Sequence, residues 1–401
     1  MHVILLADHA FAEGGAPQVA IASARALAEA GVEVTYLHGV GNLGSDALEH
    51  PRIRRIGLGG ADIHAKTAVR ALADGLWNRE PLVRLRAILA QAPENVVLHV
   101  HQWTKYFSPS LFSVLRASRF PLVVSMHDYF SACPTGLMYR FDQSKPCALT
   151  PLSARCMLSP CDPKSMIHKG VRVLRTLAAI QALGKAALDI VHVSEVGRRT
   201  IAHHMPEQAR HHVIENPIEV PRPSAARDGV GSQVVYCGRL TREKGAELVA
   251  EAARKAGLPA LFIGDGPSAE RIRLLNPQAE ITGWLSRDTV RARLAEDARV
   301  LVAPSLWPET GPLVVAEAMA LGVPTIVSDR AGASGRVQHG VTGLVVSPQA
   351  DSIAHALERL LHEPVARDMG RAAFDTYWQS PPSPEAHAAA LIRLYRAARQ
   401  G

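Results

Sequence analysis

The segment "ARVLVAPSLWPETGPLVVAEAMALGVPTIVSD", residues 298–329, decides the fold class of this chain. It starts with an apolar, β-branched run, continues through a short loop, and then has small and apolar residues at helical spacing up to Gly322. A second β-branched run follows directly. The segment therefore predicts a β-α-β unit, the building block of a parallel sheet.

Similar strand-like runs, separated by helical stretches, occur in two groups along the chain. The first group is "HVILLAD", "VEVTYL", "NVVLHVH", "PLVVSMH" and "IVHVS". The second group is "QVVYCGRL", "PALFIGDGP", "AEITGW", "ARVLVAPS", "VPTIVSD" and "TGLVVS". Residues 213–232 lie between the groups, contain three prolines and two glycines, and have no period. We therefore expect two doubly wound parallel-sheet α/β domains, residues 1–215 and 216–383, with a last helix at 384–401 that packs back on the first domain.

The composition is typical of a folded, enzyme-sized protein: 401 residues, 47% hydrophobic and 20% charged. No run reaches the about 18 apolar residues of a spanning helix, and five cysteines are too few for a disulfide scaffold. We expect a cytoplasmic protein. No motif indicates binding to nucleic acid.

The net charge of +7 is concentrated in the first half, where residues 1–216 contain 23 Lys and Arg against 17 Asp and Glu. Arginines alternate with apolar positions at residues 168–180. This pattern fits either a solvated basic face or peripheral contact with an anionic membrane, on the inner face of the cytoplasmic membrane.

Two cations follow the first strand of the second domain. Arg239 comes directly after the strand and Lys244 opens the next helix, where charge and helix dipole together favour a diphosphate. Surface charges at a strand end are the alternative explanation. Gly264 and Gly266 form a second strand-to-helix turn, which allows close backbone approach to a ligand or marks a plain turn.

Two glutamates flank the turn in the opening segment. Glu309 lies in the loop after the strand, and Glu317 lies in the helix among apolar neighbours, where a carboxylate needs a partner. Pro312 suits the first helical turn, and backbone N–H groups at residues 311–314 lack partners within the helix. The pattern indicates donors for phosphate or sugar oxygens beside acceptors for hydroxyl groups.

Several motifs together resemble the family 4 glycosyltransferases of the GT-B fold, in the family's order and over nearly the whole chain. They are "GGAPQVAIASARALAEAGVEVTYL", "SMHDYF", "HVSEVGRR", "IENPIE", "YCGRLTREKG", "FIGDGP", "PSLWPETGPLVVAEAMALGVPTIVSD" and "HGVTGLVV". The resemblance implies two Rossmann-like domains facing a deep cleft. It also implies retaining, metal-independent transfer of a sugar from a UDP- or GDP-sugar to a saccharide or lipid-linked saccharide. The reaction would require no further cofactor and would serve cell-surface polysaccharide biosynthesis.

The same resemblance implies roles for individual residues. Arg239 and Lys244 would hold the diphosphate, Glu309 the donor sugar and Glu317 the ribose, while His127 of "MHDYF" would reach the sugar and the acceptor. The donor pocket would be completed by Gly14, Gly15, Gly264, Gly283, Trp284, Gly311, Pro312, Leu313 and Val314.

One position departs from the family pattern, because Gly335 stands where an acidic residue is usual. Donor or acceptor preference is expected to differ as a result. Two alternative functions stay open at this point: a nucleotide-sugar epimerase of the GT-B fold, and a non-catalytic nucleotide-sugar-binding protein.

Four cysteines fall within 29 residues after the His127 strand: Cys133, Cys147, Cys156 and Cys161. Four thiolates can enclose a structural zinc ion. Their spacing lacks a C-x-x-C pair, so reduced thiols packed as small hydrophobic groups are the alternative. Cys237 lies in a strand and is expected in the core.

Overall fold

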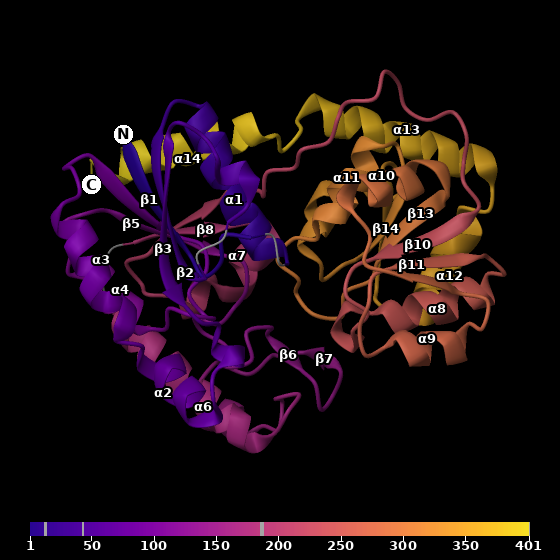
Figure 1. Cartoon of the computed structure of the whole chain (residues 1–401). Helices are drawn as coiled ribbons and strands as arrows, with labels where there is room; N and C mark the ends of the chain where they lie inside the picture. The colour runs from indigo at the N-terminus through magenta and orange to yellow at the C-terminus, as the bar shows by residue number, and fades with distance from the viewer. Residues whose placement is uncertain (12–13, 42–43, 185–187, 401) are drawn as a thin grey trace. The chain divides into compact units, whose positions relative to one another are not determined.

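The computed structural model describes residues 1–11, 14–41, 44–184 and 188–400, and strands alternate with helices along them (Figure 1). The chain forms two compact units. Unit 1 comprises Met1–Asp142, Cys147–Pro217 and Pro382–Gly401; unit 2 comprises Gln143–Pro146 and Ile218–Pro381. Each unit has its own parallel sheet, in agreement with the predicted fold class.

The sheet of unit 1 has seven strands in the order β3-β2-β1-β4-β5-β8-β9, and its neighbouring strands pair in parallel. Their bounds are β1 His2–Ala7, β2 Glu33–Val40, β3 Ile53–Gly60, β4 Val96–Val100, β5 Leu122–Met126, β8 Asp189–His192 and β9 Arg210–Val213. The two edge strands, β3 and β9, were not predicted. Their sequences, "IRRIGLGG" and "RHHV", are polar or glycine-rich because an edge strand is only partly covered.

Helices pack on both faces of this sheet. They are α1 Gly15–Glu29, α2 Ala68–Trp77, α3 Glu80–Ala90, α4 Ser110–Arg116, α5 Ala154–Leu158, α6 Met166–Leu183, α7 Glu195–Ile201 and the C-terminal α14 Pro384–Ala398. A short two-stranded sheet, β6 Tyr139–Arg140 and β7 Lys145–Pro146, lies between β5 and α5 along the chain.

Helix α14 belongs to the core of unit 1, although almost the whole of unit 2 precedes it in the sequence (Figure 1). Leu391 and Tyr395 share one buried cluster with Val3 and Leu27. The His387 ring adds a hydrogen bond to Ser23 of α1, with 2.9 Å between Nε2 and Oγ. The end of the chain is therefore a structural part of the first sheet's cover.

The sheet of unit 2 has six parallel strands in the order β12-β11-β10-β13-β14-β15. All six runs predicted as strands form them: β10 Gln233–Cys237, β11 Ala260–Ile263, β12 Glu280–Gly283, β13 Ala298–Ala303, β14 Thr325–Ser328 and β15 Gly343–Val346. The direction of strand order reverses between β10 and β13. Ligands of doubly wound sheets bind outside the carboxyl ends of the strands at such a point.

Both faces of the second sheet are buried, which explains its continuous apolar strands. Val234 and Tyr236 of β10 lie in one core cluster, and Val235 lies in another on the opposite face. The covering helices are α8 Ala246–Lys255, α9 Ala269–Leu275, α10 Arg287–Glu296, α11 Leu313–Ala320, α12 Ala350–Arg359 and α13 Glu363–Gln379. Among all helices of the described residues, none has the length and apolar content to cross a bilayer.

Candidate active site

The predicted donor-site residues of unit 2 follow the carboxyl ends of its strands. Because the strands are parallel, these ends lie along one edge of the sheet. Arg239 follows β10, Gly264 follows β11, Trp284 follows β12 and Glu309 follows β13. The topology therefore assigns all four to the same edge.

Lys244 and Glu309 form an ion pair between the Lys244 Nζ and the Glu309 Oε1. The other carboxylate oxygen of Glu309 accepts a hydrogen bond from Ser305 Oγ. Glu309 is only 6% exposed, and its backbone carbonyl accepts the Gly332 N–H at 2.7 Å. Lys244 does not open the next helix as predicted: it ends the short 3-10 helix Arg242–Lys244, and α8 begins at Ala246. Two residues from separate segments of the sequence therefore form one largely buried contact.

A close approach of two loops brings Lys244 to this position. The residue after it, Gly245, has φ +76°, and a Cβ there would lie 2.5 Å from the Pro304 carbonyl oxygen. The Leu306 N–H also donates to the Glu243 carbonyl at 2.8 Å. Glycine at 245 thus permits the turn that carries Lys244 to pack against the loop that carries Glu309.

Arg239 and the start of α11 offer further groups to an anion. The Arg239 side chain is exposed, and it takes part in none of the ion pairs found among the described residues. Helix α11 begins at Leu313, so Pro312 precedes the first turn instead of forming part of it. Proline has no N–H, and the amide donors here are those of Gly311, Leu313 and Val314.

Glu317 has cationic partners that the sequence did not reveal. The carboxylate is 7% exposed; its Oε1 lies 3.6 Å from Arg287 Nε and 4.0 Å from Arg291 Nη2. Burial, and secondly the Glu317 charge, raises the pKa of the Cys237 thiol to about 12. The two arginines are four residues apart on α10, so their spacing in the sequence indicates that they share one face of the helix. The spacing does not indicate that this face contacts Glu317.

Gly264 and Gly283 are adjacent through an isolated bridge between their backbones. Gly264 has φ +143°, and a Cβ there would lie 2.0 Å from the Gly238 carbonyl oxygen. Loop packing alone therefore requires glycine at position 264. The neighbouring Trp284 is 64% exposed, so its ring is open to a ligand or to solvent.

His127 of unit 1 belongs to a row of imidazole rings at the ends of β4 and β5. Its Nε2 lies 3.1 Å from Nδ1 of His101, and the two rings stack with centroids 5.3 Å apart. The His101 ring lies 4.2 Å from that of His99, whose Nδ1 is 2.6 Å from the Tyr395 hydroxyl of α14. His101 was not among the predicted site residues. The signal that could have found it is its position as the polar residue at the end of the strand-like run "NVVLHVH".

These rings are uncharged at neutral pH. Burial, with a smaller effect of the His387 charge, lowers the pKa of His127 to about 4, and burial lowers the pKa of His101 well below 6.5. Since a neutral imidazole has one N–H, one ring donates it and the other accepts. Burial also raises the pKa of the adjacent Asp128 to about 6.

Gly14 and Gly15 lie between β1 and α1. Gly14 precedes the helix with φ +89° and Gly15 is its first residue, while residues 12 and 13 lie outside the described part of the chain. A Cβ at either glycine would meet no atom within 4 Å. Unlike Gly264, neither position is crowded by neighbouring protein atoms.

The four clustered cysteines are free thiols. Cys161 Sγ accepts a hydrogen bond from the buried Lys169 Nζ at 2.8 Å, and Cys133 Sγ lies 3.3 Å from Thr135 Oγ1. Within the described residues, no group of three or more His, Cys, Asp or Glu side chains is arranged to hold a metal ion. The arrangement therefore gives the predicted zinc site no support.

Comparison with known proteins identifies the family of the second unit. The model of the family "Glycosyl transferases group 1" matches residues 221–376, which include every predicted donor residue of unit 2. Residues 221–376, which match this family model, are called the group 1 domain below. This domain contains both the Lys244–Glu309 pair and the partners of Glu317.

Curated relatives resemble part of the chain. Alpha-D-kanosaminyltransferase of Streptomyces kanamyceticus is 33% identical over 147 residues, which are 34% of this chain and 38% of the relative. The putative teichuronic acid biosynthesis glycosyltransferase TuaC of Bacillus subtilis is 38% identical over 137 residues, 33% of either protein. The chain thus spans little more than a third of the length of these relatives.

A solved structure resembles the whole chain, including the group 1 domain. The Anabaena protein HepE, solved in complex with UDP, aligns over 99% of this chain and 100% of HepE, with a TM-score of 0.65 and 14% identity. At this identity the likeness concerns the fold alone. The two parallel-sheet, Rossmann-like units are those of the GT-B fold, as the resemblance in the sequence implied.

Proposed function

We propose that this protein transfers a sugar from a nucleoside diphosphate donor to a saccharide or lipid-linked saccharide, with retention at the anomeric carbon. The observation that carries the proposal is the contact between Lys244 and Glu309 at the carboxyl edge of the group 1 domain. A fixed cation for a diphosphate then lies beside a fixed acceptor for sugar hydroxyls.

The diphosphate would bind Lys244, Arg239 and the amides at the start of α11. In the transfer, the bond between the anomeric carbon and the diphosphate oxygen breaks, and the acceptor oxygen bonds to the same face of that carbon. The acceptor's proton passes to the departing phosphate. The two cations would stabilise the charge that develops on the leaving group, so the step as proposed calls for no metal ion.

The carboxylates would divide the rest of the donor between them. Glu309, held by Ser305 and Lys244, would accept hydrogen bonds from the sugar. Glu317, held by Arg287, would accept hydrogen bonds from the ribose. Both are more than nine-tenths buried, so neither can turn freely to solvent and each is ready to bind hydroxyl groups.

The remaining parts of the proposal concern donor, acceptor and place of action. The donor is proposed to be a UDP- or GDP-sugar, and the name of TuaC favours a cell-surface polysaccharide. His127, uncharged beside His101, is proposed to contact the sugar or its acceptor. A lipid-linked acceptor would require action at the inner face of the cytoplasmic membrane. The four cysteines have no proposed role.

Thermal-shift measurements with UDP-, GDP- and ADP-sugars test the proposal. A donor that binds the native state raises the melting temperature in proportion to the logarithm of its concentration over its dissociation constant. We expect one nucleotide series to stabilise the wild type and to lose this effect in Lys244→Ala. No stabilisation by any of the three at millimolar concentration contradicts the proposal. If the protein converts the nucleotide-sugar to its epimer when no acceptor is present, it is an epimerase instead.

A further inference from the structure

Helix α6 exposes a row of large apolar side chains to solvent. Its exposed large side chains include Ile167 (81% exposed), Leu174 (56%), Leu177 and Ile180, which recur at helical spacing along one face. The buried side of α6 is apolar as well, with Val173, Ala179, Ala182 and Leu183 beside the polar Lys169 and Thr176. A surface helix normally buries its apolar stripe and exposes a polar face. The second apolar row on the exposed side of α6 therefore indicates that this outer face meets something other than water.

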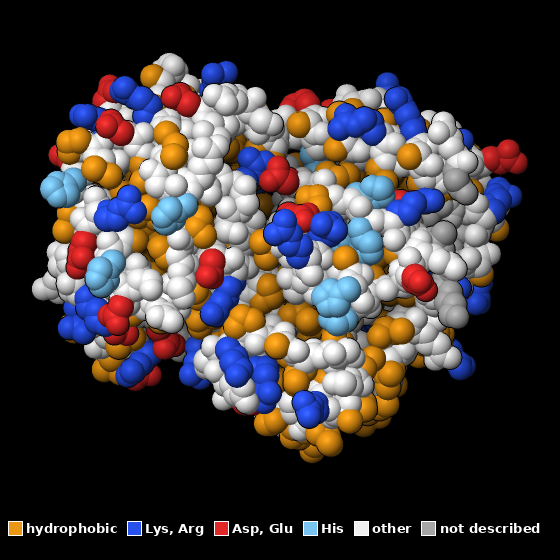
Figure 2. Space-filling view, turned by 180° about the vertical axis from the view of Figure 1, so that it is seen from behind, with side chains coloured by type: hydrophobic (Ala, Val, Ile, Leu, Met, Phe, Trp, Pro, Cys, Tyr) orange, Lys and Arg blue, Asp and Glu red, His pale blue; other side chains and the backbone are white. Residues whose placement is uncertain are grey.

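Helices that contact α6 extend this feature. Of the exposed large hydrophobic side chains, three lie on α2, two on α5 and five on α6. All other described residues together contain seven. Those of α2 and α5 include Val69 (79% exposed) and Leu158 (78%). Figure 2 shows hydrophobic side chains, with Lys and Arg among them, gathered over the lower part of the molecule, where Figure 1 places α2 and α6.

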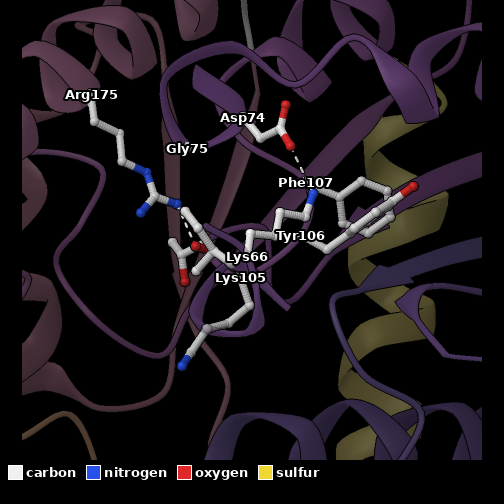
Figure 3. Close-up of a pocket in the computed structure, with 9 residues that line it drawn as sticks. Lys66, Asp74, Gly75, Lys105, Tyr106, Phe107 and Arg175 are labelled. Carbon is white, nitrogen blue, oxygen red and sulfur yellow. Dashed lines mark hydrogen bonds and ion pairs between the residues drawn. The ribbon is translucent and has the colours of Figure 1, made fainter. Parts of the chain in front are cut away.

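Polar contacts on the inner side hold α2 and α6 in this orientation (Figure 3). On α2, Asp74 forms an ion pair with Lys66 at 2.8 Å. On α6, Arg175 donates to the Thr104 carbonyl at 2.6 Å. Arg175 thus reaches inward to the loop after β4, and Asp74 binds the segment just before α2. Turning either helix about its axis would break these bonds, so the exposed apolar residues are fixed outward.

The charge of the same region is positive. Residues 151–184, all of which the structure describes, contain five Lys and Arg: Arg155, Lys164, Lys169, Arg172 and Arg175. Their single acid, Asp162, has a side chain only 1% exposed and pairs with Arg172 at 3.3 Å. Arg155 and Lys164 are exposed. An apolar face with basic residues beside it and no exposed acid is complementary to an anionic lipid surface.

We infer that α2, α5 and the outer face of α6 form a docking surface for an anionic lipid bilayer. The apolar side chains would enter the region between headgroups and acyl chains, and Arg155 and Lys164 would contact anionic headgroups. A second copy of this chain is less favourable as the occupant, because two equally basic faces repel each other. The inference deepens the membrane contact of the proposed function by naming the surface that makes it, and it does not depend on the class of acceptor.

Flotation with lipid vesicles tests this inference. Full-length protein is mixed with vesicles of phosphatidylcholine alone or with 30 mol% (about one lipid in three) phosphatidylglycerol added. The test variants are the double variant Ile167→Ser/Leu174→Ser and, separately, Lys164→Glu. Leu274→Ser is the matched control, because Leu274 is 68% exposed on α9 of unit 2. Melting temperature and donor stabilisation are measured for every variant to verify its folding.

We expect the wild type and the Leu274 control to float with the anionic vesicles, and binding to weaken at high salt. Each test variant should bind the anionic vesicles at least about tenfold more weakly than wild type. Its melting temperature and its stabilisation by the donor should not change. A wild type that stays in solution overturns the inference, as does a double variant that binds like wild type. A wild-type dimer that Ile167→Ser/Leu174→Ser converts to monomer also overturns it, in favour of self-association. Loss of donor binding in all variants would concern the proposed function alone.

Discussion

Lys244 and Glu309 are 65 positions apart in the sequence, yet each is the direct ionic partner of the other. The carboxylate therefore neutralises the ammonium group. A diphosphate must share that ammonium group with Glu309 or draw it away. The two residues should consequently have opposite effects on nucleotide affinity.

Replacing either partner tests this relation. Lys244→Ala should weaken binding of the nucleoside diphosphate and lower kcat/KM by about 10²–10³-fold, because a cation at the leaving group is lost. Glu309→Gln should lower turnover by about 10²-fold while binding of the nucleoside diphosphate stays equal or tightens, because Lys244 is released. Calorimetry and initial rates measure both quantities.

The control is Lys255→Ala, because Lys255 pairs with Glu251 and Asp351 on the surface of the same unit. It should resemble wild type in both measurements. Weaker diphosphate binding in Glu309→Gln, equal to that in Lys244→Ala, would show that the two residues do not compete.

A second prediction concerns Glu317 and the ribose. Wild type should prefer a nucleoside diphosphate to its 2′-deoxy or 3′-deoxy analogue, because a carboxylate held by Arg287 accepts hydroxyl hydrogen bonds worth roughly 1.5–3 kcal/mol. Glu317→Gln should reduce this preference about tenfold or more. Dissociation constants for the three nucleotides measure it. A preference that survives the substitution would assign the ribose to another group.

A third prediction concerns stability and pH. The pKa of His127 and of His387 is lowered mainly by burial to about 4, below the ordinary 6.5 of the unfolded chain. Between these values the unfolded chain binds more protons, so the free energy of unfolding should fall as pH falls from about 6.5 to 4. The raised pKa of Asp128 acts in the opposite direction and offsets part of the loss. Melting curves at pH 7, 6 and 5 measure the slope.

His387→Gln should flatten this pH dependence, since the amide keeps polar atoms but does not titrate in this range. Its comparison is His355→Gln, because His355 is exposed on α12. Equal slopes in wild type and His387→Gln would show that the buried ring does not contribute to the loss of stability in acid.

A fourth prediction concerns the glycines. Gly264→Ala should lower the free energy of unfolding by roughly 2 kcal/mol or more, because the new methyl group would meet the Gly238 carbonyl in a backbone conformation that L-residues avoid. Gly335→Ala should be nearly neutral, as a Cβ there meets nothing within 4 Å. Urea unfolding measures both. Similar stabilities for the two variants would contradict the close packing of the loops after β10 and β11.

The sequence was sufficient for features that follow a regular pattern. All six strands of unit 2 were predictable. Its inner strands are continuous apolar runs because they are buried on both faces, and the partly exposed edge strand β12 was predicted as well. The edge strands β3 and β9 were missed, because partly covered strands tolerate arginine, histidine and glycine. The hydrophobic pattern is therefore strongest where burial is complete.

Partners in space were less accessible than positions in sequence. Motifs located Glu317 and His127, but nothing in the sequence paired them with Arg287 or with His101. Such pairs depend on which helix or strand packs beside which, and the order of elements along the chain does not determine this. For the cysteines the sequence left a zinc site and packed thiols open, and the described side chains give the zinc site no support.

The assignment of Pro382–Gly401 to unit 1 means that the polypeptide passes from one unit to the other and back again. Neither truncation after Pro217 nor a single protease cut in the connection near that residue would yield a complete first unit. The shortened fragment would expose the apolar residues that Leu391 and Tyr395 cover, and should be insoluble unless a peptide of residues 382–401 is supplied in trans.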